Sequence, residues 1–225
     1  MVKVGINGFG RIGRLILRAL LENYKGKIQI VGINDLGSIE ANAHLIKYDS
    51  THGIIHQDIQ TSKDGFKIGN QEIKVFAEKD PANIPWGKVG ADVVLECTGI
   101  FLDKSSAEKH IKGGAKKVII SAPGKEVDFT IVQGVNSKEL KKEHNIISNG
   151  SCTTNCLAPV AMVLEKTFGI NYGYMTTIHS YTGDQKLLDT LHKDLRRARA
   201  TEGSMIPTST GAAKAMSLVL PSLKG

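Results

Sequence analysis

The sequence predicts an α/β fold: a doubly wound, mostly parallel sheet over residues 1–150, followed by a second, incomplete α+β domain over residues 151–225. Two observations predict the first domain. Short β-rich runs alternate with segments whose apolar residues recur at helical spacing, and a glycine-rich turn joins the first run to the first helix. The third observation is that this alternation stops near residue 150, which predicts a domain boundary there.

The first crossover unit occupies residues 1–35. Val2–Asn7 is a β-rich run that ends in a glycine turn. Apolar residues then recur at helical spacing until Gly26, where we expect the helix to stop. Residues 28–35 form a second β-rich run, and the strand–helix–strand order predicts a parallel pair.

The rest of the first domain continues the pattern. Glycine turn signals within alternating segments predict hairpins, and apolar runs predict buried strands. The expected elements are a helix capped by Ser38, antiparallel hairpins over residues 58–77, strands at 92–97 and 117–122 separated by a helix from Asp103 to Gly113, and strands at 129–135 and 146–148.

The second domain contains one expected strand. We predict a helix from about Cys152, a strand at residues 174–179, a basic loop at 182–203 and a helix near Thr210. A sheet needs about three or more strands to stand independently. We therefore expect this domain to be incomplete at residue 225, and the chain alone to be a poor catalyst.

Composition narrows the class of protein. No apolar run reaches membrane-spanning length, and polar residues interrupt the N-terminal stretch where a signal peptide needs an apolar core. Three cysteines are too few for a disulfide framework, which favours a cytoplasmic location. The net charge of +7 permits nucleic-acid binding, but the basic residues are mostly scattered, so nucleic acid is not the expected main partner.

The glycine turn has the spacing Gly8-x-Gly10-x-x-Gly13 between a predicted strand and a predicted helix. The first glycine permits a tight turn, the second lets the backbone approach a pyrophosphate, and the third lets helix pack on strand. Glycines retained only for a tight turn would not account for Asp35, which closes the next strand about 20 positions further on, where a ribose diol would lie. A carboxylate there repels a 2′-phosphate, so NAD is expected rather than NADP.

Cys152 follows a predicted strand and opens a predicted helix. A thiol at a helix N-terminus has its thiolate stabilised by free amides and the helix dipole, so its pKa should fall. Cys156 lies one turn later, and we interpret it as a core residue. No second Cys or His pair has metal-ligand spacing, so no metal site is expected. With a candidate thiolate in the chain, His179 becomes a candidate base.

The motifs INGFGRIGR at residues 6–14, SNGSCTTNCLAP at 148–159, IHSYTGDQ at 178–185 and PTSTGAAKA at 207–215 closely resemble the glyceraldehyde-3-phosphate dehydrogenase family. The resemblance implies a Rossmann domain, an α+β catalytic domain and a homotetramer. It also implies glycolytic, NAD-dependent oxidation of glyceraldehyde 3-phosphate to 1,3-bisphosphoglycerate with inorganic phosphate. Residues 189–192 lack a Leu-Pro pair that many NAD-specific members carry, which weakens the exclusion of NADP.

The same resemblance implies roles by position. Cys152 would be the nucleophile and His179 the base. The NAD contacts would be Asn7, Gly8, Gly10, Arg11, Ile12, Gly13, Asn34, Asp35, Lys79, Thr98, Gly99, Phe101 and Ser121. Ser151, Thr153, Thr182, Arg197, Thr210 and Gly211 would bind phosphate groups. Two alternatives remain open: an erythrose-4-phosphate dehydrogenase, which hydrolyses its thioester, and a non-catalytic basic module that binds dinucleotide or nucleic acid.

Overall fold

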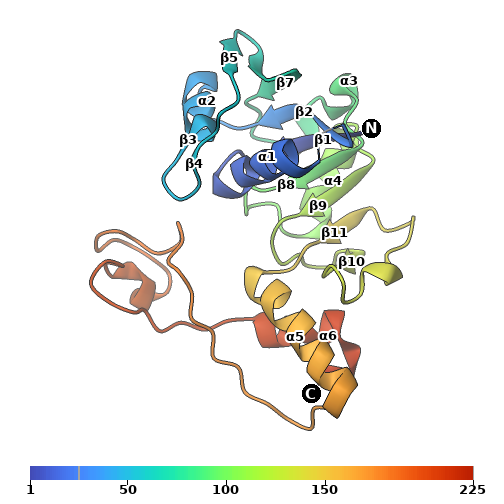
Figure 1. The fold of residues 1–225 in the computed structure, drawn as a ribbon, viewed down its shortest axis with the longest axis vertical. Helices are drawn as coiled ribbons and strands as arrows, with labels where there is room; N and C mark the ends of the chain where they lie inside the picture. The colour runs from blue at the N-terminus through green and yellow to red at the C-terminus, as the bar shows by residue number, and fades with distance from the viewer. Residues whose placement is uncertain (25, 225) are drawn as a thin grey trace. The chain divides into compact units, whose positions relative to one another are not determined.

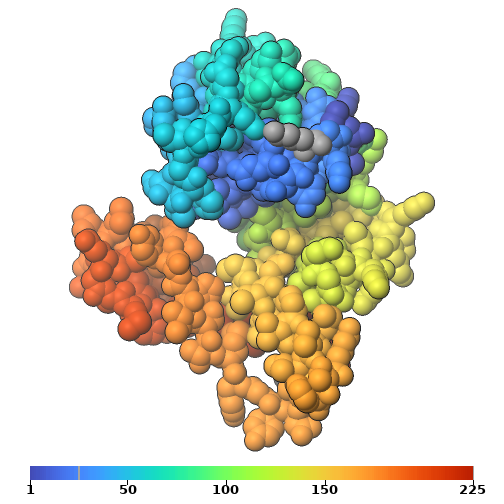
Figure 2. Space-filling model, viewed as in Figure 1, coloured from blue at the N-terminus to red at the C-terminus, as the bar shows by residue number. Residues whose placement is uncertain are grey.

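The computed structural model describes residues 1–24 and 26–224 (Figure 1). Its chain divides into two compact units, Met1–Ser151 and Cys152–Gly225, and each is considered by itself below. Gly225, the last residue of the expected second domain, lies outside the described residues. Figure 2 shows the residues of the first unit, coloured blue to yellow-green, as a closely packed body.

The first unit is built on one sheet with the strand order β10-β11-β9-β8-β1-β2-β7-β6-β5. Pairing is parallel from β10 to β7, and β7, β6 and β5 form the expected antiparallel hairpins. The strands are β1 (Val2–Asn7), β2 (Ile28–Asn34), β5 (Ile59–Ser62), β6 (Gly65–Ile68), β7 (Gln71–Phe76), β8 (Val93–Glu96), β9 (Lys117–Ile120), β10 (Phe129–Thr130) and β11 (Ile146–Ser148); β3 (Tyr48–Asp49) and β4 (Gly53–Ile54) form a separate ladder.

Helices cover both faces of this sheet. They are α1 (Arg11–Asn23), α2 (Ile39–Lys47), α3 (Trp86–Val89) and α4 (Lys104–Lys112), with 3₁₀ turns at Pro81–Asn83 and Ser137–Glu139. Ser38 caps α2 through its side chain, as expected, and Asp103 does the same for α4. The doubly wound, mostly parallel sheet predicted from the sequence is confirmed.

Two apolar clusters explain why the helices divide between the faces. Leu17 of α1 and Ile46 of α2 pack in one cluster with Ile6 of β1. Trp86 of α3 is fully buried in the other cluster. The indole needs strand positions without side chains, because a Cβ at Gly5 would lie 2.5 Å from its ring. Gly5 in β1 therefore leaves space for Trp86, which packs α3 against this face of the sheet.

The expected strand at residues 129–135 is shorter in the structure. Only Phe129–Thr130 pairs, because the Asn136 side chain takes over the next backbone groups. Its Nδ2 donates to the carbonyl oxygen of Thr130 at 2.9 Å, and its Oδ1 accepts from the amide of Val132 at 2.9 Å. The chain consequently turns where we predicted that it would continue as a strand.

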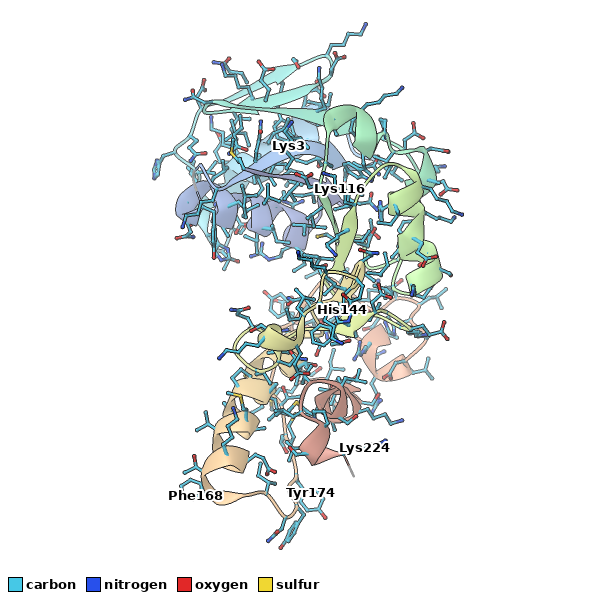
Figure 3. All side chains as sticks on the ribbon, turned by 90° about the vertical axis from the view of Figure 1, so that its right-hand side faces the viewer. Lys3, Lys116, His144, Phe168, Tyr174 and Lys224 are labelled. Atoms are coloured by element: carbon cyan, nitrogen blue, oxygen red, sulfur yellow. The ribbon has the colours of Figure 1, made fainter. Side chains whose placement is uncertain are left out.

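The second unit pairs two helices, α5 (Cys152–Phe168) and α6 (Ala212–Val219), with 3₁₀ turns at Leu195–Ala198 and Pro221–Leu223. Helix α5 continues through Pro159. The predicted strand at residues 174–179 is wrong: no strand occurs among the described residues that follow α5. Tyr174 lies on an extended segment clear of the two helices and is fully exposed (Figure 3). A β-rich run without a pairing partner has no ladder to join.

Within residues 1–24 and 26–224, no helix combines the length and the apolar character that crossing a bilayer requires.

Candidate active site

The glycine turn after β1 has the local geometry that its three glycines allow. Gly8 has a φ of +86°, which L-residues with a side chain rarely adopt, and a Cβ there would lie 2.7 Å from the amide nitrogen of Thr98. A Cβ at Gly13 would lie 2.3 Å from the carbonyl oxygen of Gly8, so glycine permits the close approach of α1 to the turn. A Cβ at Gly10 would meet nothing within 4 Å, which leaves the backbone there open to a ligand.

Asp35 lies across this turn. Its Oδ2 accepts the amide hydrogen of Phe9 at 2.8 Å, and its Oδ1 accepts that of Gly37 at 2.8 Å. The side chain is half-buried; Oδ1 also lies 3.5 Å from the side-chain amide nitrogen of Asn42, whereas Oδ2 keeps a lone pair beyond its bond to Phe9. The carboxylate thus fixes the turn and can still accept hydrogen bonds from a diol.

The other candidate cofactor contacts follow the carboxyl ends of parallel strands. Thr98, Gly99 and Phe101 come after β8, and Ser121 comes after β9. Ligands bind at this edge of open α/β sheets. Ile12 and Lys79 are exposed.

Arg11, at the start of α1, is paired within the protein. Its guanidinium lies 2.9 Å from Asp49 Oδ2, at the end of β3. Hydrogen bonds from the amides of His52 and Thr51, together with Arg11, hold the pKa of Asp49 well below its usual range despite the opposing effect of partial burial. Arg11 is half-exposed, so it presents a positive charge beside the glycine turn.

Asn7 and Asn34 end β1 and β2 and are buried. Asn34 Nδ2 donates to Asn7 Oδ1 at 2.8 Å, and Asn7 Nδ2 donates to Glu96 Oε2 at 2.6 Å. Their side chains therefore support the edge of the sheet from inside. Sequence reasoning missed Glu96 and gave His110 no role, although a Glu within an apolar strand was a usable signal.

In the second unit, Cys152 is the first residue of α5 and is exposed. The Oγ1 of Thr153, the next residue, lies 3.1 Å from Nε2 of His179. The chain between α5 and His179 thus returns the imidazole to the first turn of the helix that carries the thiol. A thiol at the start of this helix and an imidazole bonded to the next residue are a nucleophile and a base of the kind that add to a carbonyl carbon and accept the proton of the product.

Of the two remaining cysteines, Cys97 is largely buried and Cys156 is exposed. Burial raises the pKa of Cys97 to about 12, despite a hydrogen bond from Ser121. The expectation that Cys156 lies in the core is wrong, because it is exposed. The buried face of α5 is formed by Thr153, Thr154, Ala158 and Ala161, and the spacing that places Cys152 and Cys156 together places both off that face.

The candidate phosphate-binding residues of the basic loop are held by one another and by neighbours. Thr182 Oγ1 donates to Gln185 Oε1 at 2.9 Å, while Arg197 pairs with Asp184 and donates from Nε to Thr208 Oγ1 at 2.9 Å. The Arg197 guanidinium lowers the pKa of Asp184. These contacts bring Thr182 and Arg197 into one loop cluster.

Thr210 and Gly211 precede α6. The hydroxyl oxygen of Thr210 accepts the amide hydrogen of Ala212 at 3.2 Å, so it bonds to the first turn of that helix. No group of three or more His, Cys, Asp or Glu side chains suited to a metal ion occurs in the part of the chain that the structure describes.

Comparison with known proteins assigns both units to one family. Residues 2–104 match the family described as glyceraldehyde 3-phosphate dehydrogenase, NAD binding domain, and residues 151–225 match its C-terminal domain. A relative from Bacillus cereus, glyceraldehyde-3-phosphate dehydrogenase 1, is 56% identical over 100% of this chain and 67% of its own length. The chain belongs to the glyceraldehyde-3-phosphate dehydrogenase family.

Other members of the glyceraldehyde-3-phosphate dehydrogenase family match equally far. The Streptomyces avermitilis glyceraldehyde-3-phosphate dehydrogenase 2 is 57% identical and the Geobacillus stearothermophilus enzyme 56% identical, each over 100% of this chain and 67% of the relative. The resemblance stated from the four motifs is therefore confirmed.

Proposed function

We propose that this chain supplies the NAD-binding domain and the nucleophile of a phosphorylating glyceraldehyde-3-phosphate dehydrogenase of glycolysis. The carrying observation is the joint presence, in a chain of this family, of a glycine turn bridged by Asp35 and a helix that begins at Cys152 with His179 beside it. Either feature alone is compatible with other chemistry. Together they match an NAD-dependent oxidation through a covalent thioester.

The chain's residues fit NAD. The open position at Gly10 leaves room for backbone amides to approach a pyrophosphate, and the half-buried Asp35 can accept from a ribose diol. Two of the other proposed contacts directly follow this turn in the sequence: Arg11 and Ile12. The others follow strands that end at the same edge of the sheet: Lys79, Thr98, Gly99, Phe101 and Ser121. When bound, NAD supplies the hydride acceptor.

The residues of the second unit perform the covalent chemistry. The Cys152 sulfur adds to the aldehyde carbon of glyceraldehyde 3-phosphate, giving a thiohemiacetal. His179 accepts the hydroxyl proton as the carbon is oxidised to a thioester. Positioned acid–base assistance of this kind contributes about 10²–10⁴-fold in rate. Inorganic phosphate then attacks the thioester carbon, which releases 1,3-bisphosphoglycerate and the free thiol.

We assign the phosphate groups to polar residues by their positions in the family motifs. Ser151, Thr153, Thr210 and Gly211 would bind the attacking inorganic phosphate, and Thr182 the phosphate of the substrate. Arg197 would add positive charge, exchanging part of its pairing with Asp184 for a phosphate oxygen. We also propose that the protein forms a homotetramer and is located in the cytoplasm. Its three free cysteines support a location in a reducing compartment.

The deciding experiment assays two aldehydes with and without inorganic phosphate. We expect NADH formation from glyceraldehyde 3-phosphate to continue beyond one equivalent per active site only when phosphate is present. Faster turnover of erythrose 4-phosphate, independent of phosphate, would identify the hydrolysing alternative instead.

A further inference from the structure

A continuous chain of buried hydrogen bonds crosses the first unit and ends at the proposed cofactor edge. Trp86 Nε1 donates to His110 Nδ1 at 3.0 Å, and His110 Nε2 lies 2.9 Å from Glu96 Oε2. Glu96 is 1% exposed, and both Trp86 and His110 are 0% exposed. The mechanism described above uses none of these three side chains.

The direction of these bonds is fixed at one end. An indole nitrogen only donates, so Nδ1 of His110 must accept and carry no proton. The ring proton therefore resides on Nε2, which donates to Glu96. The ring of Phe101, a proposed cofactor contact, forms a T-shaped pair with the same imidazole, with ring centroids 6.5 Å apart.

The Glu96 carboxylate is surrounded by donors. Its Oε2 accepts from Asn7 Nδ2 at 2.6 Å and from His110. Its Oε1 accepts from the amide of Thr98 at 2.7 Å and from the Thr98 hydroxyl at 2.5 Å. Four donors therefore converge on one buried carboxylate, and each oxygen serves two.

These donors belong to the segments that we assign to NAD. The register of the sheet sets Asn34, Asn7 and Glu96 side by side at the ends of β2, β1 and β8. The Thr98 hydroxyl in turn accepts the amide hydrogen of Ile100 at 3.1 Å, which shapes the turn through Gly99. Asn34 continues the series of hydrogen bonds, because its side chain bonds to both the carbonyl oxygen and the amide of Glu78, next to Lys79.

We propose that Glu96 is the positioning residue of the NAD site, with His110 and Trp86 holding its carboxylate in place. This inference rests on the proposed function for the identity of the ligand. An apolar residue would fill the same volume without the cost of burying a charge. The carboxylate is used because it joins three strand ends and the Thr98–Ile100 turn at one point.

The test is Glu96→Gln, which keeps the size of the side chain but replaces one acceptor oxygen with an NH₂ group. In one orientation the new donor faces Asn7 and His110, and in the other it faces both donors of Thr98. His110 cannot relieve the first case, because protonating Nδ1 instead would oppose the Trp86 donor. We expect NAD affinity, measured by calorimetry on this chain, to fall about tenfold or more.

A stability-matched control separates positioning from folding. Ile120→Val removes one methylene at the position directly opposite Glu96 on β9, where Ile120 is fully buried. We expect this variant to lose thermal stability but to bind NAD as tightly as the unsubstituted chain. Equal NAD affinity in Glu96→Gln and Ile120→Val would overturn the proposal.

Two further measurements keep the test decisive. Amide hydrogen exchange of Thr98 and Ile100 should accelerate in Glu96→Gln and stay slow in Ile120→Val, with no need for NAD. If Glu96→Gln does not fold, Trp86→Phe removes the donor to His110 together with part of the buried ring and should weaken NAD binding less, in the same direction; unchanged binding there contradicts the proposal. Failure of the unsubstituted chain to bind NAD would instead refute the proposed function, while the exchange measurement still decides whether Glu96 holds the turn.

Discussion

Replacing Cys152 by Ser should lower phosphate-dependent NADH formation by about 10⁴-fold or more and leave NAD affinity unchanged. The reason is chemical. A serine hydroxyl is far less nucleophilic than a thiol at neutral pH, because a much smaller fraction of it is ionised. Initial rates with saturating aldehyde, NAD and phosphate measure the loss, and calorimetry with NAD measures the unchanged affinity.

Cys156→Ser is the matched control for this variant. Cys156 is exposed like Cys152 and lies one turn later on α5, so the substitution makes the same chemical change away from the first turn of the helix. We expect it to retain most of the rate. A Cys152→Ser protein that keeps its rate, or a Cys156→Ser protein that loses it, would show that the nucleophile is wrongly assigned.

Gly13→Ala and Gly10→Ala should separate the two roles of the glycine turn, which are the packing of α1 against the turn and the binding of NAD. The Cβ added at Gly13 would lie 2.3 Å from the carbonyl oxygen of Gly8, which is backbone and cannot swing away. We expect the free energy of unfolding to fall by about 1–3 kcal/mol, measured by urea titration, and NAD binding to be lost with the turn.

The Cβ added at Gly10 meets nothing, and the φ of −68° there suits alanine. Stability should change by less than about 1 kcal/mol. NAD affinity should nevertheless fall, by about 100-fold, because the methyl group occupies the approach of the pyrophosphate to the backbone. A Gly10→Ala chain that binds NAD normally would mean that the cofactor does not use this turn.

Much of the first unit could be predicted from the sequence because its signals are local. The run Val2–Asn7, the glycine turn and the spacing of apolar residues on α1 lie next to one another, and parallel pairing follows from their order. Asp35 could be assigned to the turn because a crossover of ordinary length returns the chain to the same edge.

The errors occur where structure depends on partners. Residues 174–179 have the composition of a strand, but the described residues that follow α5 contain no strand with which they could pair. A local sequence pattern does not show whether a pairing partner exists. The sequence predicts a core position for Cys156 because a metal site and a disulfide with Cys152 are both unfavourable, whereas the buried face of α5 is formed by Thr153, Thr154 and two alanines. Spacing shows that Cys152 and Cys156 share a face, not which face is buried.

The Glu96–His110 pair could not be predicted by spacing at all. Asn7 and Glu96 meet across 89 positions of sequence, and they do so because β1 and β8 are neighbours in the sheet. His110 gained a partner only when α4 placed its ring beside the end of β8 and the indole of Trp86. Such long-range polar contacts require the topology before the residues can be interpreted.

The most direct measurement is mass spectrometry of the protein after one turnover with glyceraldehyde 3-phosphate and NAD in the absence of phosphate. We predict one equivalent of NADH and one acyl group, which fragmentation of the peptide that holds both Cys152 and Cys156 places on Cys152 and which added inorganic phosphate releases. NADH formed without an acyl group on Cys152, or an acyl group on Cys97 or Cys156 instead, would contradict the proposed mechanism.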